Sequence, residues 1–141
     1  SEYGAKWVID YTQEDFVERV NEITKGAGVI AAFDAIGGNN PTKSAKCLST
    51  FGTLCTFGAA SGPSTLTMDD LPASAQYTKG SIATLITLPE MYKSAAAEFF
   101  KHVETGSLKI NIGQTYALKD AAQAHLDLES RKTVGSIILK P

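Results

Sequence analysis

Two short apolar segments of this chain each end in glycine, and this repeated ending is the feature that most constrains the fold. Residues 29–36 run into Gly37 and Gly38, and residues 53–57 run into Gly58. Ligands of open α/β sheets bind just outside the carboxyl ends of the strands, and glycine there lets the main chain approach a ligand closely. The two endings, with a helix-like stretch between them, therefore predict one rim of a nucleotide crevice.

In the first half of the chain, the expected elements alternate between strand and helix. Strands are expected at residues 7–9, 29–36 and 53–57, and the helices between them begin at an N-cap on Thr12 and at Pro41. The continuous apolar run at 29–36 is typical of a strand covered on both faces. The alternation predicts an α/β fold with parallel strands joined by crossover helices.

The second half of the chain is expected to add three helices and further extended segments. The predicted segments are a helix over 68–79, an edge strand over 82–88, a helix over 90–105 opened by Pro89, an extended piece over 108–112, a helix over 118–129 and a strand over 136–139. The edge position of residues 82–88 follows from their β-branched, threonine-rich composition. No internal repeat or linker interrupts the sequence, so one compact unit is predicted.

Charge and cysteine usage exclude several classes of partner. The net charge of the 141 residues is -2, which favours neither nucleic acid nor an anionic membrane, and the apolar runs are far shorter than a membrane span. Cys47 and Cys55 lack the spacing of a zinc site. They are interpreted as small buried thiols in a reducing compartment, and the protein is expected to be cytoplasmic.

The motifs of hydrolases and P-loop proteins are absent, and a few single residues stand out instead. Asp34 lies near the carboxyl end of an apolar strand. It could orient a loop or touch a ligand, and the first role is favoured. Tyr11 could pack at a strand end or contact a base or phosphate. Arg131 could be an ordinary surface arginine or a phosphate clamp.

One expected element of a dinucleotide-binding domain is missing from the sequence. Such a domain opens with a strand, the motif GxGxxG and a helix whose N-terminus holds the pyrophosphate, and no stretch of this chain has that pattern. The predicted fold class is therefore a partial Rossmann-like parallel sheet with flanking helices, lacking the first glycine-rich βα unit.

Motifs along nearly the whole chain resemble one family in order and spacing. They are YGA at 3–5, VIDY at 8–11, EDF at 14–16, the apolar segment with two glycines at 29–38, FG at 51–52, FGAASG at 57–62, KGS at 79–81 and LESRKT at 128–133. Together they resemble the C-terminal part of the zinc-independent quinone oxidoreductases (zeta-crystallin-like) of the medium-chain dehydrogenase/reductase superfamily.

The resemblance implies an NADPH-dependent reductase that transfers hydride to a quinone or an α,β-unsaturated carbonyl. It implies that Tyr11 lies near the adenosine 2′-phosphate and that Arg131 lies near the phosphate or nicotinamide end. The other residues implied to bind the cofactor are Ile36, Gly37, Phe57, Gly58, Ala59 and Ser61.

The leading hypothesis is that residues 1–141 are the C-terminal portion of a dinucleotide-binding domain, without the N-terminal GroES-like domain that completes the active cleft. The isolated chain is then expected to be inactive. Two alternatives remain open. The chain could be a non-enzymatic module that forms a homodimer through the edge strand running from Ile82 to Leu88, or an enoyl reductase unit of a larger synthase in the same superfamily.

Overall fold

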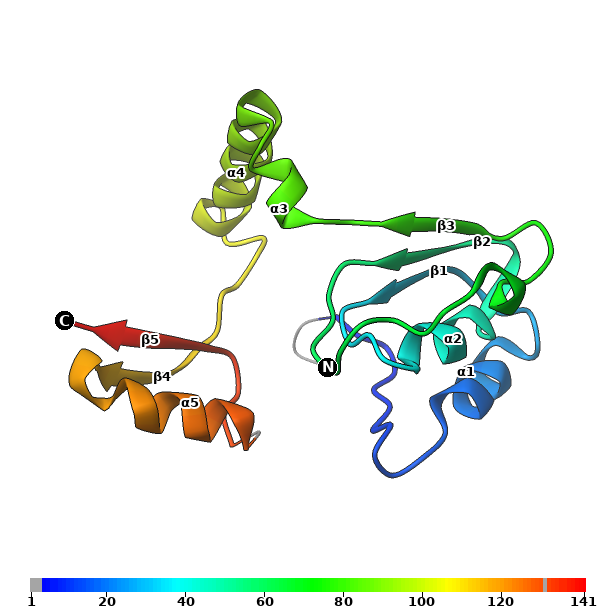
Figure 1. The fold of residues 1–141 in the computed structure, drawn as a ribbon, viewed down its shortest axis with the longest axis horizontal. Helices are drawn as coiled ribbons and strands as arrows, with labels where there is room; N and C mark the ends of the chain where they lie inside the picture. The colour runs from blue at the N-terminus through cyan, green and yellow to red at the C-terminus, as the bar shows by residue number, and fades with distance from the viewer. Residues whose placement is uncertain (1–3, 131) are drawn as a thin grey trace. The chain divides into compact units, whose positions relative to one another are not determined.

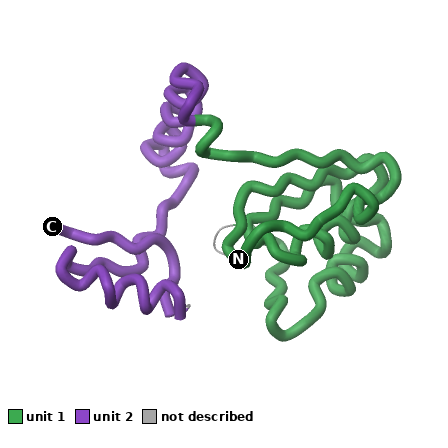
Figure 2. Tube along the Cα trace, viewed as in Figure 1, with its two compact units in different colours: residues 1–85 green, residues 86–141 purple. Residues whose placement is uncertain are grey.

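The structure, a computed structural model, describes residues 4–130 and 132–141. It divides into two compact units, Ser1–Leu85 and Ile86–Pro141 (Figure 2). The sequence pattern had predicted a single unit. The division falls just after a short helix, and each unit has its own parallel sheet.

The first unit is built on a three-stranded parallel sheet. Its strands are β1 (Val29–Asp34), β2 (Leu48–Thr56) and β3 (Gln76–Lys79), in the order β1-β2-β3. The helix α2 (Asn40–Ala45) connects β1 to β2 and contacts both, and α1 (Phe16–Thr24) lies on the same side of the sheet (Figure 1). The parallel α/β arrangement predicted from the sequence is confirmed.

The core of this unit lies between the sheet and α2. Ala45, Leu48 and Leu54 are buried there, and residues from the loop before β3, such as Leu66 and Leu71, pack against them. The opposite face of the sheet is open within the unit, because the side chains of Ile30 and Phe33 are 82% and 74% exposed. The prediction that β1 is covered on both faces is therefore wrong for this unit taken alone.

The start of the chain differs from the predicted strand and N-cap. Residues 7–9 do not form the predicted strand. No strand among the described residues pairs with them, and a strand requires such a partner for its N–H and C=O groups. The helix α1 is capped by Asp15, whose Oδ1 accepts a hydrogen bond from Val17 N at 2.8 Å. Thr12 is unable to serve as the predicted cap because its hydroxyl donates to Asp10 Oδ1 at 2.6 Å.

The helix predicted over 68–79 and the strand predicted over 82–88 are both wrong. Residues Met68–Asp70 form only a single 3₁₀ turn, and Ser74 has a φ of 65°, a left-handed conformation that ends any helix before β3. After β3, Ser81 caps a helical turn, since its Oγ accepts from Thr84 N at 3.3 Å and its carbonyl accepts from Leu85 N. That turn is α3 (Ile82–Leu85), so no edge strand runs from Ile82 to Leu88.

The second unit contains a long helix and a βαβ arrangement. Its elements are α4 (Pro89–Glu104), β4 (Ile112–Ala117), the 3₁₀ turn η2 (Leu118–Asp120), α5 (Ala121–Glu129) and β5 (Ser136–Lys140). The strands β4 and β5 pair in parallel. Pro89 opens α4, as the sequence predicted, whereas the strand expected at 108–112 begins only at Ile112. The Tyr116 hydroxyl donates to Asp127 Oδ2 at 2.9 Å and so joins β4 to α5.

Candidate functional site

The three strands of the first unit end in one row. Asp34 is in register with Thr56, and Thr56 is in register with Lys79. The main chain continues this alignment for one more residue, because Phe57 N donates to the Asp34 carbonyl at 2.9 Å and Gly80 N donates to the Thr56 carbonyl at 2.8 Å. Three loops therefore leave the sheet together at its carboxyl edge, where open α/β sheets bind ligands.

Asp34 organises the first of these loops. Its carboxylate is only 2% exposed. Its Oδ1 accepts from the main-chain N–H groups of Ile36 and Gly37, both at 2.9 Å, and its Oδ2 accepts from Asn40 Nδ2 at 2.5 Å and Ser44 Oγ at 3.4 Å. The favoured interpretation of Asp34 as a loop-orienting residue is confirmed, and both carboxylate oxygens are already occupied.

The loops at residues 35–38 and 57–62, here called the glycine loops, bind each other through the main chain. Ser61 N donates to the Ile36 carbonyl at 2.6 Å, and Gly38 N donates to the Gly62 carbonyl at 3.0 Å. Gly37 has a φ of 73°, and a Cβ there would meet the Gly62 oxygen and lie 2.9 Å from Ala59 Cα. The loops that follow the two glycine-terminated segments are thus held to each other by main-chain hydrogen bonds.

Two cavities flank the second glycine loop and share part of their walls. One has a volume of about 270 Å³ and reaches toward Ser81, and the other has a volume of about 430 Å³ and reaches toward Ser64 and Tyr77. The shared residues are Thr56, Gly58, Ala59 and Lys79. Thr56 is buried, and its hydroxyl lies 2.9 Å from the Tyr77 hydroxyl.

The wall between the cavities offers free hydrogen-bond donors and an apolar surface. Among the described residues, nothing accepts from the N–H groups of Gly58 and Ala59. The Phe57 side chain beside them is 54% exposed. A flat, partly apolar ligand that carries polar or anionic groups fits these features.

The structure brings most of the predicted site residues together, with two exceptions. Those gathered at the carboxyl edge are Ile36, Gly37, Phe57, Gly58, Ala59 and Ser61. Tyr11 lies in a turn before α1 and is 49% exposed, and no hydrogen bond among the described residues ties it to the glycine loops. Arg131 lies outside the described residues.

The turn around Tyr11 is ordered by its neighbour Asp10. The Asp10 carboxylate accepts from the Thr12 hydroxyl at 2.6 Å and from Thr12 N at 3.0 Å, and these two hydrogen bonds hold the pKa of Asp10 below its ordinary value. The hydrogen bonds from Thr12 therefore favour the ionised form of the Asp10 carboxylate.

Lys79 is the site residue that sequence reasoning missed. It ends β3, a strand that the sequence pattern assigned to a helix, and so it was not expected beside Thr56. The available signal was the pair Lys79-Gly80, which resembles the other strand endings in placing a glycine directly after the strand.

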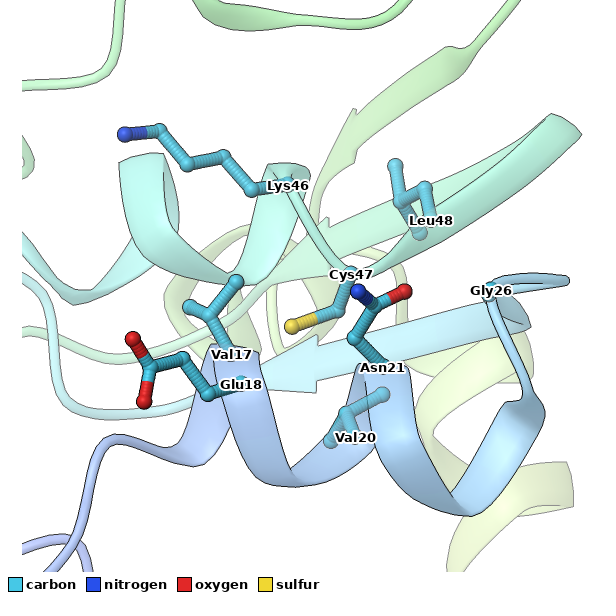
Figure 3. A pocket seen from close by; sticks show the side chains of 9 residues that line it. Val17, Glu18, Val20, Asn21, Gly26, Lys46, Cys47 and Leu48 are labelled. Atoms are coloured by element: carbon cyan, nitrogen blue, oxygen red, sulfur yellow. The ribbon is translucent and has the colours of Figure 1, made fainter.

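A further cavity, of about 210 Å³, lies at the opposite end of β2 (Figure 3). Val17 and Val20 of α1 line it together with Cys47 and Leu48. Burial raises the pKa of the Cys47 thiol, and the nearby Asp15 charge adds to the effect. The thiol also donates to the Lys43 carbonyl at 3.6 Å, so Cys47 acts as a small buried side chain.

Within residues 4–130 and 132–141, the structure holds neither a cluster of metal ligands nor a membrane-spanning helix. No three His, Cys, Asp or Glu side chains in this part of the chain are grouped closely enough to hold a metal ion. No helix in the same ranges has the length and apolar character needed to cross a bilayer.

Parallel strands, flanking helices and glycine loops at the carboxyl edge together define a Rossmann-like α/β protein. The family described as "Zinc-binding dehydrogenase" matches residues 3–139. The chain belongs to this family, within the medium-chain dehydrogenase/reductase superfamily, and it corresponds to the C-terminal part of the quinone oxidoreductases. The resemblance found in the sequence is confirmed.

Individual relatives agree with this assignment. The chain is 41% identical to a quinone oxidoreductase of Salmonella typhimurium, covering 98% of this chain and 44% of the relative. It is 35% identical to a 2-haloacrylate reductase of Burkholderia sp, covering 98% and 43%. The solved structure of Escherichia coli quinone oxidoreductase complexed with NADPH matches with a TM-score of 0.85 and 37% identity, covering 98% and 44%. The chain thus spans less than half the length of these relatives.

Proposed function

We propose that this chain forms one wall of the cofactor site of an NADPH-dependent oxidoreductase. The observation that carries the proposal is the pair of interlocked glycine loops at the carboxyl edge of the sheet, flanked by two cavities. Its similarity to a quinone oxidoreductase that was solved with NADPH supports the choice of cofactor.

The residues present fit such a cofactor. Gly58 and Ala59 expose main-chain donors, Phe57 offers an apolar surface, and Ile36 and Ser61 hold the two loops together through their main-chain bond. The proposed contacts therefore run along Ile36, Gly37, Phe57, Gly58, Ala59 and Ser61, with Tyr11 toward the adenosine 2′-phosphate and Arg131 toward the phosphate or nicotinamide end.

The proposed reaction is hydride transfer to a quinone or an α,β-unsaturated carbonyl compound. When bound, NADPH supplies the hydride, and the residues of this chain bind and orient the cofactor. The substrate side of the cleft is proposed to come from a GroES-like domain outside the chain. The isolated chain is therefore expected to bind cofactor and to leave it unoxidised when a quinone is added.

The test is calorimetric titration of NADPH into the chain and into the variant Ala59→Glu. A carboxylate on the cavity wall repels the cofactor phosphates, so binding is expected to weaken about tenfold or more. The matched control is Ala73→Glu, an exposed alanine of the same unit that lines neither cavity. The proposal fails if the unaltered chain does not bind at about 1 mM NADPH, or if Ala59→Glu binds as tightly as Ala73→Glu.

A homodimer is the second proposal, and the free edge of β3 favours it. In the sheet order β1-β2-β3, one edge of β3 has no strand beside it among the described residues of the unit, and all four residues of β3 are exposed. Unpaired edges of this kind pair readily with another chain. Sedimentation equilibrium is expected to give twice the chain mass of 15.0 kDa, and a mass equal to one chain would contradict the dimer.

A further inference from the structure

The helix α1 is held weakly against the rest of the first unit. None of its nine residues is buried, whereas the shorter helix α2 buries Pro41 and Ala45. The apolar side chains Val17 and Val20 of α1 line the cavity of about 210 Å³ at the start of β2 (Figure 3). An amphipathic helix is held to its domain mainly by burial of its apolar face. Little of this stabilisation is available to α1.

Hydrogen bonds and ion pairs between the α1 segment and another element come from one residue, Lys43 of α2, among the described residues. Its Nζ donates to Asp15 Oδ2 at 3.3 Å and lies 5.9 Å from the centre of the Phe16 ring. The other carboxylate oxygen of Asp15 caps α1 by accepting from Val17 N. The remaining hydrogen bonds of residues 15–26 stay within that segment and its adjoining turns. Asp15 therefore both starts the helix and joins it to α2.

The segments on either side of α1 allow the helix to move without breaking the sheet. On the N-terminal side, residues 5–14 pair with no strand among the described residues. On the C-terminal side, Gly26 has a φ of 80°, and the nearest atom to a Cβ there would be 3.8 Å away. Gly28 is fixed against β2, because a Cβ there would lie 2.6 Å from Ser49 N. Glycine at the end of an element is suited to act as a hinge, and Gly26 has this place.

We propose that α1 is a flap that opens about Gly26 independently of the sheet, and that the ion pair of Asp15 with Lys43 is its latch. Opening widens the cavity at the start of β2 and uncovers the thiol of Cys47, which lines that cavity and is 8% exposed when the flap is closed. Local openings of this kind cost less free energy than global unfolding. The glycine loops lie at the opposite end of β2, so the flap is independent of the proposed function.

The experiment measures the alkylation rates of the two native cysteines by iodoacetamide, resolved by peptide mass analysis. Asp15→Ala removes both the latch and the helix cap, and the Cys47 rate is expected to rise about tenfold. Asp15→Asn keeps a capping oxygen and loses the charge of an exposed ion pair, so a rise of about threefold is expected. The matched control is Glu22→Gln, which removes an ion pair with Arg19 inside α1 and is expected to leave the rate within about twofold.

Cys55 separates opening of the flap from general unfolding. It lies on β2 in register with Phe33 of β1 and Thr78 of β3, so access to it depends on the sheet. Its alkylation rate is expected to be the same in the unaltered chain and in the variants. Low concentrations of urea are expected to change the Cys47 rate only slightly, because a local opening exposes little surface. An unchanged Cys47 rate in Asp15→Ala, or equal acceleration of Cys47 and Cys55, would overturn the flap. Equal effects of Asp15→Asn and Glu22→Gln would overturn the latch.

Discussion

Replacement of Asp34 by alanine is expected to lower the free energy of unfolding of the first unit by about 3 kcal/mol. The carboxylate is 2% exposed and accepts from the N–H groups of Ile36 and Gly37 and from the Asn40 amide. Alanine leaves these donors buried or half-buried without an acceptor, and each unpaired donor carries its desolvation cost. Urea unfolding followed by the fluorescence of Trp7, the single tryptophan, measures the change.

Two further variants separate the hydrogen bonds of Asp34 from the general effect of losing a carboxylate. Asp34→Asn keeps an oxygen for the loop N–H groups but sets its own amide against Asn40, so a loss of about half that size is expected. Asp69→Ala removes an exposed carboxylate of the same unit and is expected to change stability by less than about 0.5 kcal/mol. Similar losses for Asp34→Ala and Asp69→Ala would contradict the loop-orienting role.

Replacement of Gly37 by alanine is expected to cost about 3 kcal/mol and to separate the two glycine loops. The φ of 73° is a left-handed conformation that alanine adopts at a cost of about 1 kcal/mol. The added Cβ would also meet the Gly62 oxygen and lie 2.9 Å from Ala59 Cα, so the main chain must move. Hydrogen exchange is expected to show faster exchange at Gly38 N and Ser61 N, which bond across the loops.

Gly62 provides the matched control for this steric effect. Its φ of 96° is equally unsuited to alanine, but a Cβ there would have no atom within 4 Å. Gly62→Ala is therefore expected to cost only the conformational part, about 1 kcal/mol, and to leave exchange at Ser61 N slow. If Gly62→Ala and Gly37→Ala were equally destabilising, close approach of the loops at Gly37 would not explain the effect.

Segments with strong local signals were predicted well from the sequence. The helix α4 has a proline at its start, a long amphipathic pattern and a glycine just beyond its end, and it was found within one residue of its expected bounds. The strand β1 was found within the apolar run that ends in glycine, and the helix α2 begins next to the proline that was expected to open it. In each case the information lies within a few neighbouring residues.

Segments whose conformation depends on a distant partner were predicted poorly. Gln76–Lys79 is a strand because β2 pairs with it, although its own sequence follows a helix-like stretch. Residues 82–88 have β-branched composition, but no strand among the described residues pairs with them, and a hydrogen bond from Thr84 N to Ser81 Oγ caps the helix α3 instead. Propensity is a weak guide in both places because pairing and capping outweigh it.

The sequence by itself determined that two apolar strands end in glycine and that their loops lie at one edge of a parallel sheet. Glycine and apolar periodicity are local properties, and parallel pairing then carries both endings to the same side. Only the tertiary structure decided that Asp34 accepts hydrogen bonds from the first loop and that the two loops hydrogen-bond to each other. It also decided that Lys79 ends a strand in register with Thr56, at the same edge of the sheet. Those relations depend on hydrogen bonds and strand register between residues far apart in the chain, which local sequence patterns do not encode.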